Sequence, residues 1–217
     1  MKKITKEKFD KLIAGTEVIE KDGHGLKVLE TQDGRMIKIF RRKRFLSTAL
    51  FKPYALRFVK NADKLRALNI PTVHIDSVSN CPDIKRQIIV YKKLAGELLR
   101  DTFEQNSDTK KLGRLFGKFV AQLHAKGVYF RSIHLKNILV LGNGELGLID
   151  ISDMQIKRNA LSLRLCLRNF QHMLRYPQDK KIIKDNFNDF LDAYAQQAAL
   201  KESQKNIVKA RLLELIS

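Results

Sequence analysis

Cysteine is scarce in this sequence, which carries two among its 217 residues, Cys81 and Cys166. Two thiols cannot by themselves build a disulfide framework or a zinc site. No run approaches the roughly 18 apolar residues of a membrane-spanning helix, and the charged N-terminus lacks the apolar stretch of a secretion signal. Repeats, low-complexity tracts and Ser/Pro-rich linkers are also missing. These absences indicate a globular protein of a reducing cytoplasm, with one large domain or two small lobes.

Acidic residues are also few: 23 Asp and Glu stand against 42 Lys and Arg, which gives a formal charge of +19. The excess is uneven, because residues 35–66 hold eleven basic residues and a single acid, Asp63. Such a charge favours an anionic partner: a nucleotide, a nucleic acid, a lipid head group or a phosphorylated sugar. The densest run, Arg41–Arg44, is typical both of a solvated surface and of a binding site. Aromatic residues lie nearby, at spacings that fit base stacking and core positions alike: Phe40, Phe45, Phe51, Tyr54 and Phe58.

Alternation of apolar and polar residues predicts a β-rich first half with one helix. The expected strands are residues 17–20, 26–31, 36–40, 73–78 and 86–91, with a hairpin turn at Asp33-Gly34 and a helix that begins at Pro53. The composition changes near residues 93–100, so two domains are predicted, 1–93 and 94–217.

The second half is mostly helical. An apolar stripe over residues 112–123 predicts its first helix. A tight hairpin joins the expected strands 137–141 and 146–151. Three further helices are predicted, at residues 160–175, 180–196 and 202–215.

Two features of the first half are suited to phosphates. Gly23-His24-Gly25 forms a glycine turn between expected strands, where backbone N–H groups can approach a phosphate, although most such turns are plain hairpins. Lys38 stands alone among the apolar residues of the strand 36–40. This lysine either pairs with phosphates or marks the solvent face of an amphipathic strand.

Hard oxygen ligands are placed in the loop and strand that follow residue 130. Asn137 ends a loop, and Asp150 closes the apolar run 146–149 thirteen residues later. An amide oxygen and a carboxylate from separate short elements are ligands that Mg²⁺–nucleotide sites use. Taken alone, Asp150 also suits a helix cap or a surface acid.

In order and spacing, residues 17–175 resemble the protein kinase-like fold. Kinases carry a catalytic loop H-x-D-x-x-x-x-N and, one hairpin later, a metal-binding Asp. Phe130, Ser132 and Asn137 stand at the His, Asp and Asn of that loop, and Asp150 stands at the metal-binding Asp. His134 matches the second His of the loop H-G-D-L-H-P-G-N found in aminoglycoside phosphotransferases.

The same resemblance implies an α+β, bilobal fold with a nucleotide-binding N-lobe and a minimal helical C-lobe that carries the catalytic and metal-binding loops. It implies ATP and Mg²⁺ as cofactors. Lys38 matches the lysine of V-A-I-K, and Gly23 and Gly25 match a degraded glycine-rich loop whose third Gly is Val28. Tyr91 and Lys92 belong to the segment that would be the hinge for adenine.

More narrowly, the chain resembles the lipopolysaccharide core kinases of Gram-negative bacteria, and among them the short proteins often labelled toluene tolerance. The resemblance is carried by four segments: Asp22–Leu29, Arg57–Ala62, Asn69–Val73 and Tyr129–Leu135. It implies ATP-dependent phosphorylation of an inner-core heptose at the cytoplasmic face of the inner membrane. The acceptor would then be an anionic or phosphorylated glycolipid, and the run Arg41–Arg44 is assigned to that glycolipid or to an anionic membrane surface.

The sequence departs from the kinase pattern at the residues that activate the acceptor. Ser132 replaces the catalytic Asp, and a serine cannot act as a carboxylate base. Asn61 stands where a helix Glu should pair with Lys38, unless Asp63 substitutes for it. His134 is suited to accepting a proton, to binding a phosphate, or only to making the loop rigid through a hydrogen bond to the backbone.

Three hypotheses follow from these residues. The first is an atypical sugar kinase, supported by Lys38, Asn137 and Asp150. The second is a pseudokinase that acts as a regulator or scaffold in envelope biogenesis, supported by Ser132, Asn61 and Val28. The third, a nucleic-acid-binding protein, is supported by charge alone. The chain has neither an Ala-Pro-Glu element nor a long activation segment, which favours a small or glycolipid acceptor over a peptide.

Overall fold

The computed structural model describes residues 1–41 and 53–217. These residues form two compact units, each described separately below. The sheet unit comprises Met1–Arg66 and Thr72–Leu94, and the helical unit comprises Ala67–Pro71 and Ala95–Ser217. Part of the basic run, Arg42–Arg44, lies outside the described residues, as do Phe45 and Phe51.

A six-stranded sheet dominates the described part of the sheet unit, in the order β1-β5-β6-β4-β3-β2. All neighbouring strands are antiparallel except β1 and β5. The strands are β1 (Lys2–Lys3), β2 (Glu17–Asp22), β3 (Gly25–Glu30), β4 (Arg35–Arg41), β5 (His74–Cys81) and β6 (Arg86–Lys92). The turn at Asp33-Gly34 joins β3 to β4, as predicted, and Gly34 has the positive φ of 75° that suits glycine there.

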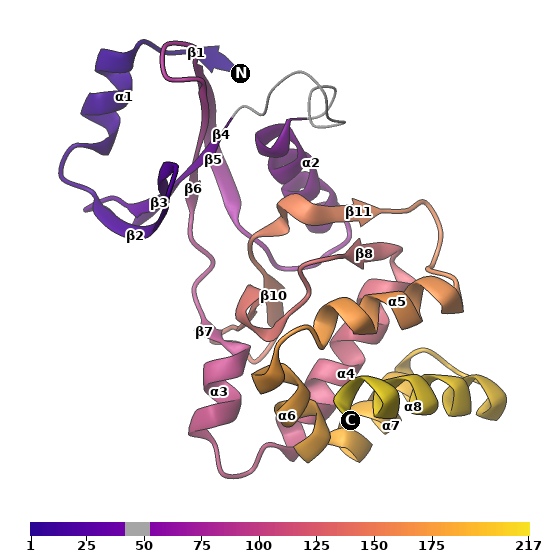
Figure 1. Cartoon of the computed structure of the whole chain (residues 1–217). Helices are drawn as coiled ribbons and strands as arrows, with labels where there is room; N and C mark the ends of the chain where they lie inside the picture. The colour runs from indigo at the N-terminus through magenta and orange to yellow at the C-terminus, as the bar shows by residue number, and fades with distance from the viewer. Residues whose placement is uncertain (42–52) are drawn as a thin grey trace. The chain divides into compact units, whose positions relative to one another are not determined.

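The two helices of the sheet unit, α1 (Lys6–Ile13) and α2 (Tyr54–Ala67), lie on opposite sides of strands β4–β6 (Figure 1). Successive side chains of a strand point to opposite faces, so β4 divides its residues between the two helices. Ile37 and Ile39 pack in a cluster with Phe9 of α1. On the other face, the ring of Phe58 from α2 lies 6.1 Å from that of Phe40. Both faces of the central strands are therefore covered.

The described helical unit carries two small sheets, with strand orders β10-β9-β7 and β11-β8. Their strands are β7 (Glu97–Leu98), β8 (Val128–Phe130), β9 (Ile138–Val140), β10 (Leu146–Leu148) and β11 (Met154–Ile156). The 3-10 turn η1 (Leu135–Asn137) precedes β9, and η2 (Ile151–Asp153) follows β10. The loop between β8 and β9 is the predicted catalytic loop.

Helices make up most of this unit: α3 (Leu99–Gln105), α4 (Lys110–Ala125), α5 (Leu163–Met173), α6 (Pro177–Asp185), α7 (Phe187–Gln197) and α8 (Glu202–Ile216). The rings of Phe116 on α4 and Phe190 on α7 lie 5.3 Å apart in the core. At Gly117 the two helices approach so closely that an added Cβ would lie 2.3 Å from the carbonyl oxygen of Phe190. Among the described residues, no helix is both long and apolar enough to cross a membrane.

The observed α+β architecture confirms the predicted fold class, with a β-rich first part that contains one main helix and a helical second part. The single helix expected at 180–196 is wrong in detail, because Asn186 separates α6 from α7. The side chain of Asn186 donates to the carbonyl oxygen of Ile182 and accepts from Thr109, so it is occupied at the junction. The short helix α3 was not anticipated from the sequence.

Candidate active site

Lys38 occupies the middle of β4, on the face that α2 covers. Its register neighbours are Val28 on β3 and Ile89 on β6, both buried. The Nζ atom lies 5.7 Å from the ring centroid of Phe58 and 6.0 Å from that of Phe40. An ammonium group over aromatic faces is stabilised while its hydrogens stay able to donate. Lys38 is half-buried on this covered face of the sheet, so it does not mark a solvent face of the strand.

Asn61 is the polar residue that α2 buries, with 6% of its surface exposed. It follows Phe58 by one turn of the helix, and therefore lies on the same side of α2. Asp63 is an exposed residue that forms an ion pair with Arg66, 2.5 Å between Oδ1 and Nη2. The substitution of Asp63 for the missing helix Glu is thus not observed, and the amide of Asn61 occupies the buried position.

The glycine turn between β2 and β3 is open. A Cβ added at Gly23 or Gly25 would meet no atom within 4 Å, and Gly25 has a φ of +110° that side chains rarely adopt. Asp22 accepts a hydrogen bond of 2.8 Å from the backbone N–H of His24, and this bond holds the pKa of the carboxyl below its ordinary value. The turn thus has room for a phosphate. The N–H of His24, however, already donates to Asp22.

Tyr91 and Lys92 end β6, between β4 and β5. Their register partners are Met36 and Ile75 for Tyr91, and Arg35 and His74 for Lys92. The Tyr91 ring is buried against Phe58, with the centroids 5.5 Å apart. The side chain of Tyr91 is therefore part of the core of the sheet unit. The segment that follows β6 begins at Lys93.

In the helical unit, hydrogen bonds fix the orientation of the Asn137 amide. Its Nδ2 atom lies 2.9 Å from the carbonyl oxygen of Ser132 and 3.2 Å from Nε2 of His134. A carbonyl oxygen can only accept, so the atom beside it must be the amide nitrogen. Nδ2 therefore donates to both groups, and Oδ1 of Asn137 is left to accept from elsewhere or to bind a cation.

The same geometry fixes the tautomer of His134. Because Nε2 accepts from Asn137, the neutral ring carries its hydrogen on Nδ1, which is buried without a hydrogen-bond partner among the described residues. Burial, and next the positive charge of Arg100, lower the pKa of His134, while Asp150 opposes them. The ring also packs edge-on against Tyr176, 5.0 Å between centroids. His134 is thus a neutral residue that orients Asn137, which supports the role of making the loop rigid rather than that of a proton acceptor.

Asp150 follows β10 in the left-handed conformation, with φ 48° and ψ 47°. Such a backbone is uncommon for a residue with a side chain, and it is concentrated at functional sites. The N–H of Ile149 donates to the carbonyl oxygen of Asn137 over 3.0 Å, so the residue before Asp150 is tied directly to Asn137. Asp150 itself is exposed.

Asn137 and Asp150 thus supply an amide oxygen and a carboxylate from adjacent segments. These are hard ligands of the kind that Mg²⁺ takes together with waters and nucleotide phosphates. No group of three or more His, Cys, Asp or Glu side chains in the described residues could hold a metal. Two protein donors would leave the remaining positions of such an ion to water or phosphate oxygens.

Ser132 is half-buried at the start of the loop, where its carbonyl oxygen accepts from Asn137. The neighbouring Arg131 donates from Nη2 to Asp153 over 2.8 Å, and its backbone N–H donates to the carbonyl oxygen of Asp153. Arg131 thus joins β8 to β11 as a structural ion pair. Asp153 is engaged in that pair and does not replace the missing catalytic carboxylate.

Buried polar contacts that the sequence did not reveal support the catalytic loop. Arg100 on α3 forms an ion pair with Asp179 on α6, 2.7 Å between Nη2 and Oδ1, and the pair is almost fully buried. The other oxygen of Asp179 accepts from the N–H of Leu135 within the loop. These residues lie far apart in the sequence, so no local pattern could have paired them.

A second support chain leads to the residue before the loop. The Tyr194 hydroxyl donates to Nδ1 of His124, Nε2 of His124 donates to Oδ1 of Asn169, and Nδ2 of Asn169 donates to the carbonyl oxygen of Phe130. The carbonyl oxygen of Phe130 can only accept, so it determines the donor and the acceptor in each hydrogen bond of this series. His124 is itself buried, with 4% of its surface exposed.

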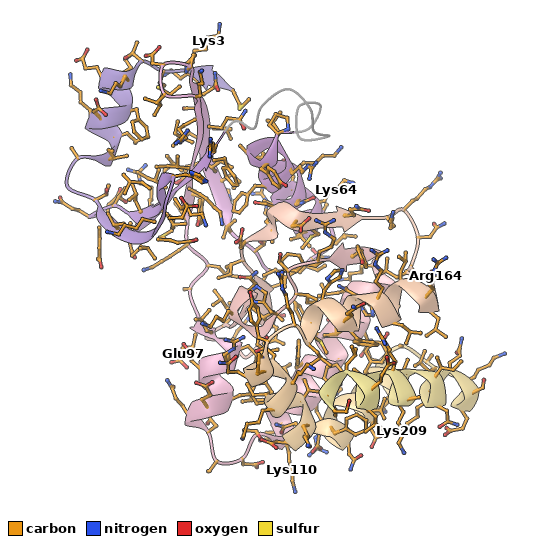
Figure 2. The ribbon with its side chains drawn as sticks, in the orientation of Figure 1. Lys3, Lys64, Glu97, Lys110, Arg164 and Lys209 are labelled. Atoms are coloured by element: carbon orange, nitrogen blue, oxygen red, sulfur yellow. The ribbon has the colours of Figure 1, made fainter. Side chains whose placement is uncertain are left out.

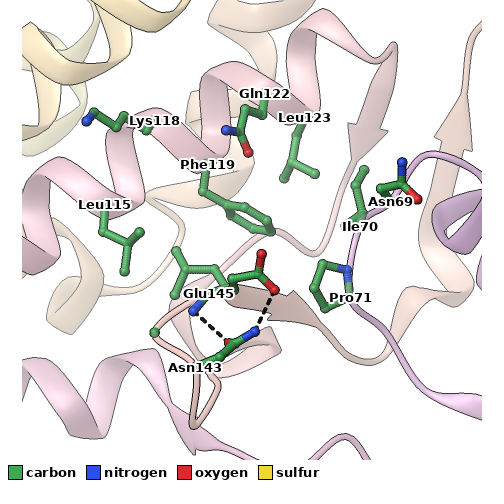
Figure 3. A pocket seen from close by; sticks show the side chains of 12 residues that line it. Asn69, Ile70, Pro71, Leu115, Lys118, Phe119, Gln122, Leu123, Asn143 and Glu145 are labelled. Carbon is green, nitrogen blue, oxygen red and sulfur yellow. Dashed lines mark hydrogen bonds between the residues drawn. The ribbon is translucent and has the colours of Figure 1, made fainter.

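A cavity of about 260 Å³ lies elsewhere in the helical unit (Figure 3). It is formed by one side of α4, the turn between β9 and β10, and the segment Asn69–Pro71. Phe119 and Ile70 contribute to its apolar wall, and Glu145 is held at its edge by Asn143. None of the four predicted catalytic residues lines it, so this cavity is separate from the loop.

Comparison with known proteins gives a family match over most of the chain. The model of the lipopolysaccharide kinase (Kdo/WaaP) family matches residues 15–194. A solved structure of WbdD is 15% identical with a TM-score of 0.49, covering 86% of this chain and 48% of that one. A co-crystal structure of WbdD with the kinase inhibitor LY294002 is 16% identical with a TM-score of 0.48, covering 85% and 47%. The chain spans about half the length of these solved structures.

Among curated proteins, a DNA-directed RNA polymerase subunit beta'' of Bigelowiella natans is 28% identical over 163 residues. The matched stretch covers 71% of this chain and 10% of that protein.

Proposed function

The chain belongs to the lipopolysaccharide kinase (Kdo/WaaP) family, which confirms the resemblance carried by its motifs, and we propose that it phosphorylates a heptose of the lipopolysaccharide inner core. In this proposal ATP is the phosphoryl donor and Mg²⁺ the metal. The acceptor is an anionic glycolipid at the cytoplasmic face of the inner membrane of a Gram-negative bacterium. The toluene-tolerance proteins are the subgroup that the chain resembles.

The observation that carries the proposal is the arrangement of Asn137 and Asp150. Ser132 and His134 hold the amide so that Oδ1 of Asn137 is left for a cation, and Ile149 ties Asp150 to the same residue. When bound, Mg²⁺ neutralises phosphate charge that develops during transfer. Lys38, Gly23 and Gly25 of the sheet unit are the groups assigned to the nucleotide phosphates.

The transfer proposed here proceeds without a carboxylate base. Phosphoryl transfer passes through a loose transition state, so positioning and charge neutralisation supply most of the catalysis. A general base contributes about 10²–10⁴-fold. We therefore expect a slow kinase, in which Ser132 lies beside the acceptor hydroxyl and His134 acts through Asn137.

A pseudokinase of the same family is the second candidate. It is favoured by the two nitrogens of His134, because one accepts from Asn137 and the other is buried, so that neither is placed to take a proton from an acceptor. The nucleic-acid alternative loses support, because Phe40 and Phe58 pack against each other between sheet and helix and are not available for stacking on bases.

Nucleotide binding is the first test. Thermal unfolding of the whole chain is followed with and without Mg²⁺–ATP, for the wild type, for Asp150→Asn and for Asp185→Asn. Asp185 is a matched control, because it is an exposed aspartate of the same unit that pairs with Lys181. We expect stabilisation by Mg²⁺–ATP in the wild type and in Asp185→Asn, and its loss in Asp150→Asn. No shift in the wild type would overturn the proposed ATP-dependent kinase.

Transfer is the second test. Radioactive phosphate from ATP is followed into inner-core oligosaccharide from which phosphate has been removed. Transfer by the wild type supports the kinase. Transfer that appears only in Ser132→Asp identifies a pseudokinase.

A further inference from the structure

Three exposed cations belong to segments of the helical unit that adjoin the catalytic loop. They are Lys136 in η1, Arg168 on α5 and Arg175 in the turn between α5 and α6, and together they are called the basic cluster here. The densest positive charge of the sequence lies in residues 35–66. The three residues of the basic cluster lie outside that range and are scattered along the chain.

Hydrogen bonds hold α5 against the strand that leads into the loop. The Tyr129 hydroxyl and Nε2 of His172 are 3.0 Å apart, and Asn169 donates to the carbonyl oxygen of Phe130 over 2.7 Å. Arg168 precedes Asn169 and lies one helical turn before His172, so it shares the half-exposed side of α5 with that histidine. The position of Arg168 relative to β8 is thus set by contacts on both sides of it.

The backbone at Arg175 is held next to the loop by the residue that follows it. The next residue, Tyr176, packs its ring edge-on against His134 of the loop, and the guanidinium of Arg100 lies 5.5 Å from the Tyr176 ring centroid. Arg175 therefore lies where the end of α5 meets the catalytic loop. Lys136 lies in the loop itself, directly before Asn137.

Positive side chains lie near both His134 and His172. After burial, positive charges lower both pKa values: Arg100 and then Arg175 and Lys136 act on His134, and Arg131 and then Arg168 and Arg175 act on His172. Arg175 contributes to both shifts. Both histidines are neutral near pH 7 and add no charge of their own.

The carboxylates nearby are occupied by other partners. Asp179 pairs with Arg100, and Asp153 pairs with Arg131. Asp150 is the carboxylate proposed to hold Mg²⁺. In the described residues none of the three cations of the basic cluster forms a salt bridge, so the region is left with an excess of positive charge next to the place of transfer.

On the premise of the proposed function, we propose that Lys136, Arg168 and Arg175 bind a phosphate or carboxylate group that the acceptor already carries. Two guanidinium groups and an ammonium suit such a group, because a guanidinium can make paired hydrogen bonds to its oxygens. The anion would hold the sugar so that its reacting hydroxyl lies near Ser132. The basic cluster thereby replaces, by positioning, part of what the missing base would contribute.

The test compares two acceptors: a heptose-containing oligosaccharide with a phosphate on a neighbouring sugar, and the same oligosaccharide after phosphatase treatment. The enzymes are the wild type, Arg168→Gln/Arg175→Gln, and the matched control Lys110→Gln/Lys209→Gln, whose two lysines lie on α4 and α8 (Figure 2). We expect the wild type and the control to have a KM about tenfold lower for the phosphorylated acceptor. The double arginine variant should lose that preference, while its KM for ATP stays within twofold. Equal KM values for both acceptors in the wild type would overturn the proposal.

A binding arm separates this proposal from the proposed function. If the wild type transfers phosphate to neither acceptor, calorimetry with the phosphorylated oligosaccharide decides. Binding that the double arginine variant loses keeps the basic cluster as a sugar-phosphate site of a pseudokinase, and no binding overturns it. A third arm uses phosphatidylglycerol vesicles. If the double variant loses only vesicle binding and keeps oligosaccharide binding, the cluster is a membrane contact and the proposal is wrong.

Discussion

The sheet unit and the helical unit place their polar groups in different ways. In the sheet unit the ion pairs are on the surface, as in Lys27–Glu20 and Arg35–Asp33, and a backbone ladder between strands fixes Lys38. The helical unit also has surface ion pairs, such as Lys181–Asp185, but it adds buried polar contacts, as in Arg100–Asp179 and the series of hydrogen bonds from Tyr194 to Phe130. A strand positions its residues through its own hydrogen bonds, whereas a catalytic loop has no such ladder. The loop is therefore positioned by buried side chains, which makes it the more sensitive of the two regions.

Removing one partner of the Arg100–Asp179 pair should have the largest effect on stability. Arg100→Met leaves the Asp179 carboxylate buried without its counter-charge, which typically costs about 3–5 kcal/mol. Burial already raises the pKa of Asp179, because the charged form is poorly solvated there. Urea unfolding of the wild type and the variant measures the free energy of unfolding.

The control for this prediction is the double variant Arg100→Met/Asp179→Leu. Replacing both charges by apolar groups removes the buried carboxylate together with its partner, so much of the lost stability should return. The N–H of Leu135 loses its acceptor in this variant, so loop function should not return with stability. If Arg100→Met is as stable as the wild type, the helical unit does not depend on its buried polar contacts, and the contrast with the sheet unit is wrong.

The buried histidine of the helical unit should make stability depend on pH. Desolvation lowers the pKa of His124 to about 4, against 6.5 for an exposed histidine. The unfolded chain therefore takes up a proton below about pH 6.5, and the folded chain does so only near pH 4. Stability from this residue is complete above pH 6.5, and about 3 kcal/mol of it is lost as the pH falls to 4.

Denaturant unfolding at a series of pH values measures this loss. The variant His124→Gln serves as the comparison, because glutamine does not titrate in this range. The pKa values of His134 and His172 are also lowered, so both proteins will keep some pH dependence. The difference in slope between them isolates His124, and equal slopes would contradict its burial as a neutral ring.

Gly117→Ala tests how closely α4 and α7 pack. The new methyl group would lie 2.3 Å from the carbonyl oxygen of Phe190, so one helix must shift. Overpacking of this kind costs about 1–3 kcal/mol. The matched control is Gly23→Ala in the sheet unit, where the added Cβ meets nothing within 4 Å and stability should change by less than about 0.5 kcal/mol. Equal melting temperatures for the two variants would contradict the close approach of the helices.

The same contrast explains what could be predicted from the sequence. Strand alternation placed Lys38 correctly in β4, and the hairpin at Asp33-Gly34 was recognised because both signals are local. Asn137 and Asp150 were found by motif spacing, and the structure ties Asp150 to Asn137 through Ile149.

Long-range polar contacts could not be predicted. Arg100 and Asp179 have no local feature that distinguishes them from surface charges, and only the fold shows that both are buried. The basic cluster was missed for the same reason, because Lys136, Arg168 and Arg175 come from three segments. The role of His134 was left open by the sequence, since the choice depends on which atom of Asn137 faces its ring.

A substitution in the catalytic loop should change metal affinity rather than stability. His134→Leu removes the acceptor that orients the Asn137 amide, so Oδ1 should be poorly held and affinity for Mn²⁺ in the presence of ATP should fall about tenfold. Electron paramagnetic resonance of Mn²⁺, used in place of Mg²⁺, measures the free ion. His134→Gln, which can still accept from Asn137, should recover most of the affinity. His172→Leu is the matched control, because His172 contacts Tyr129 and not Asn137, and metal affinity that falls equally in it would point to a general loss of structure.

The smallest effect is expected at the surface of the sheet unit. Lys27 forms ion pairs with Glu20 at 2.7 Å and with Asp22 at 3.7 Å, and its side chain is 44% exposed. Exposed pairs contribute about 0–1 kcal/mol, because water screens the charges and two long side chains lose freedom. Lys27→Met should therefore change the free energy of unfolding by less than about 1 kcal/mol, and added salt should reduce the difference further. A loss as large as that of Arg100→Met would mean that the sheet unit also depends on its charges, and that the distinction drawn between the two units does not hold.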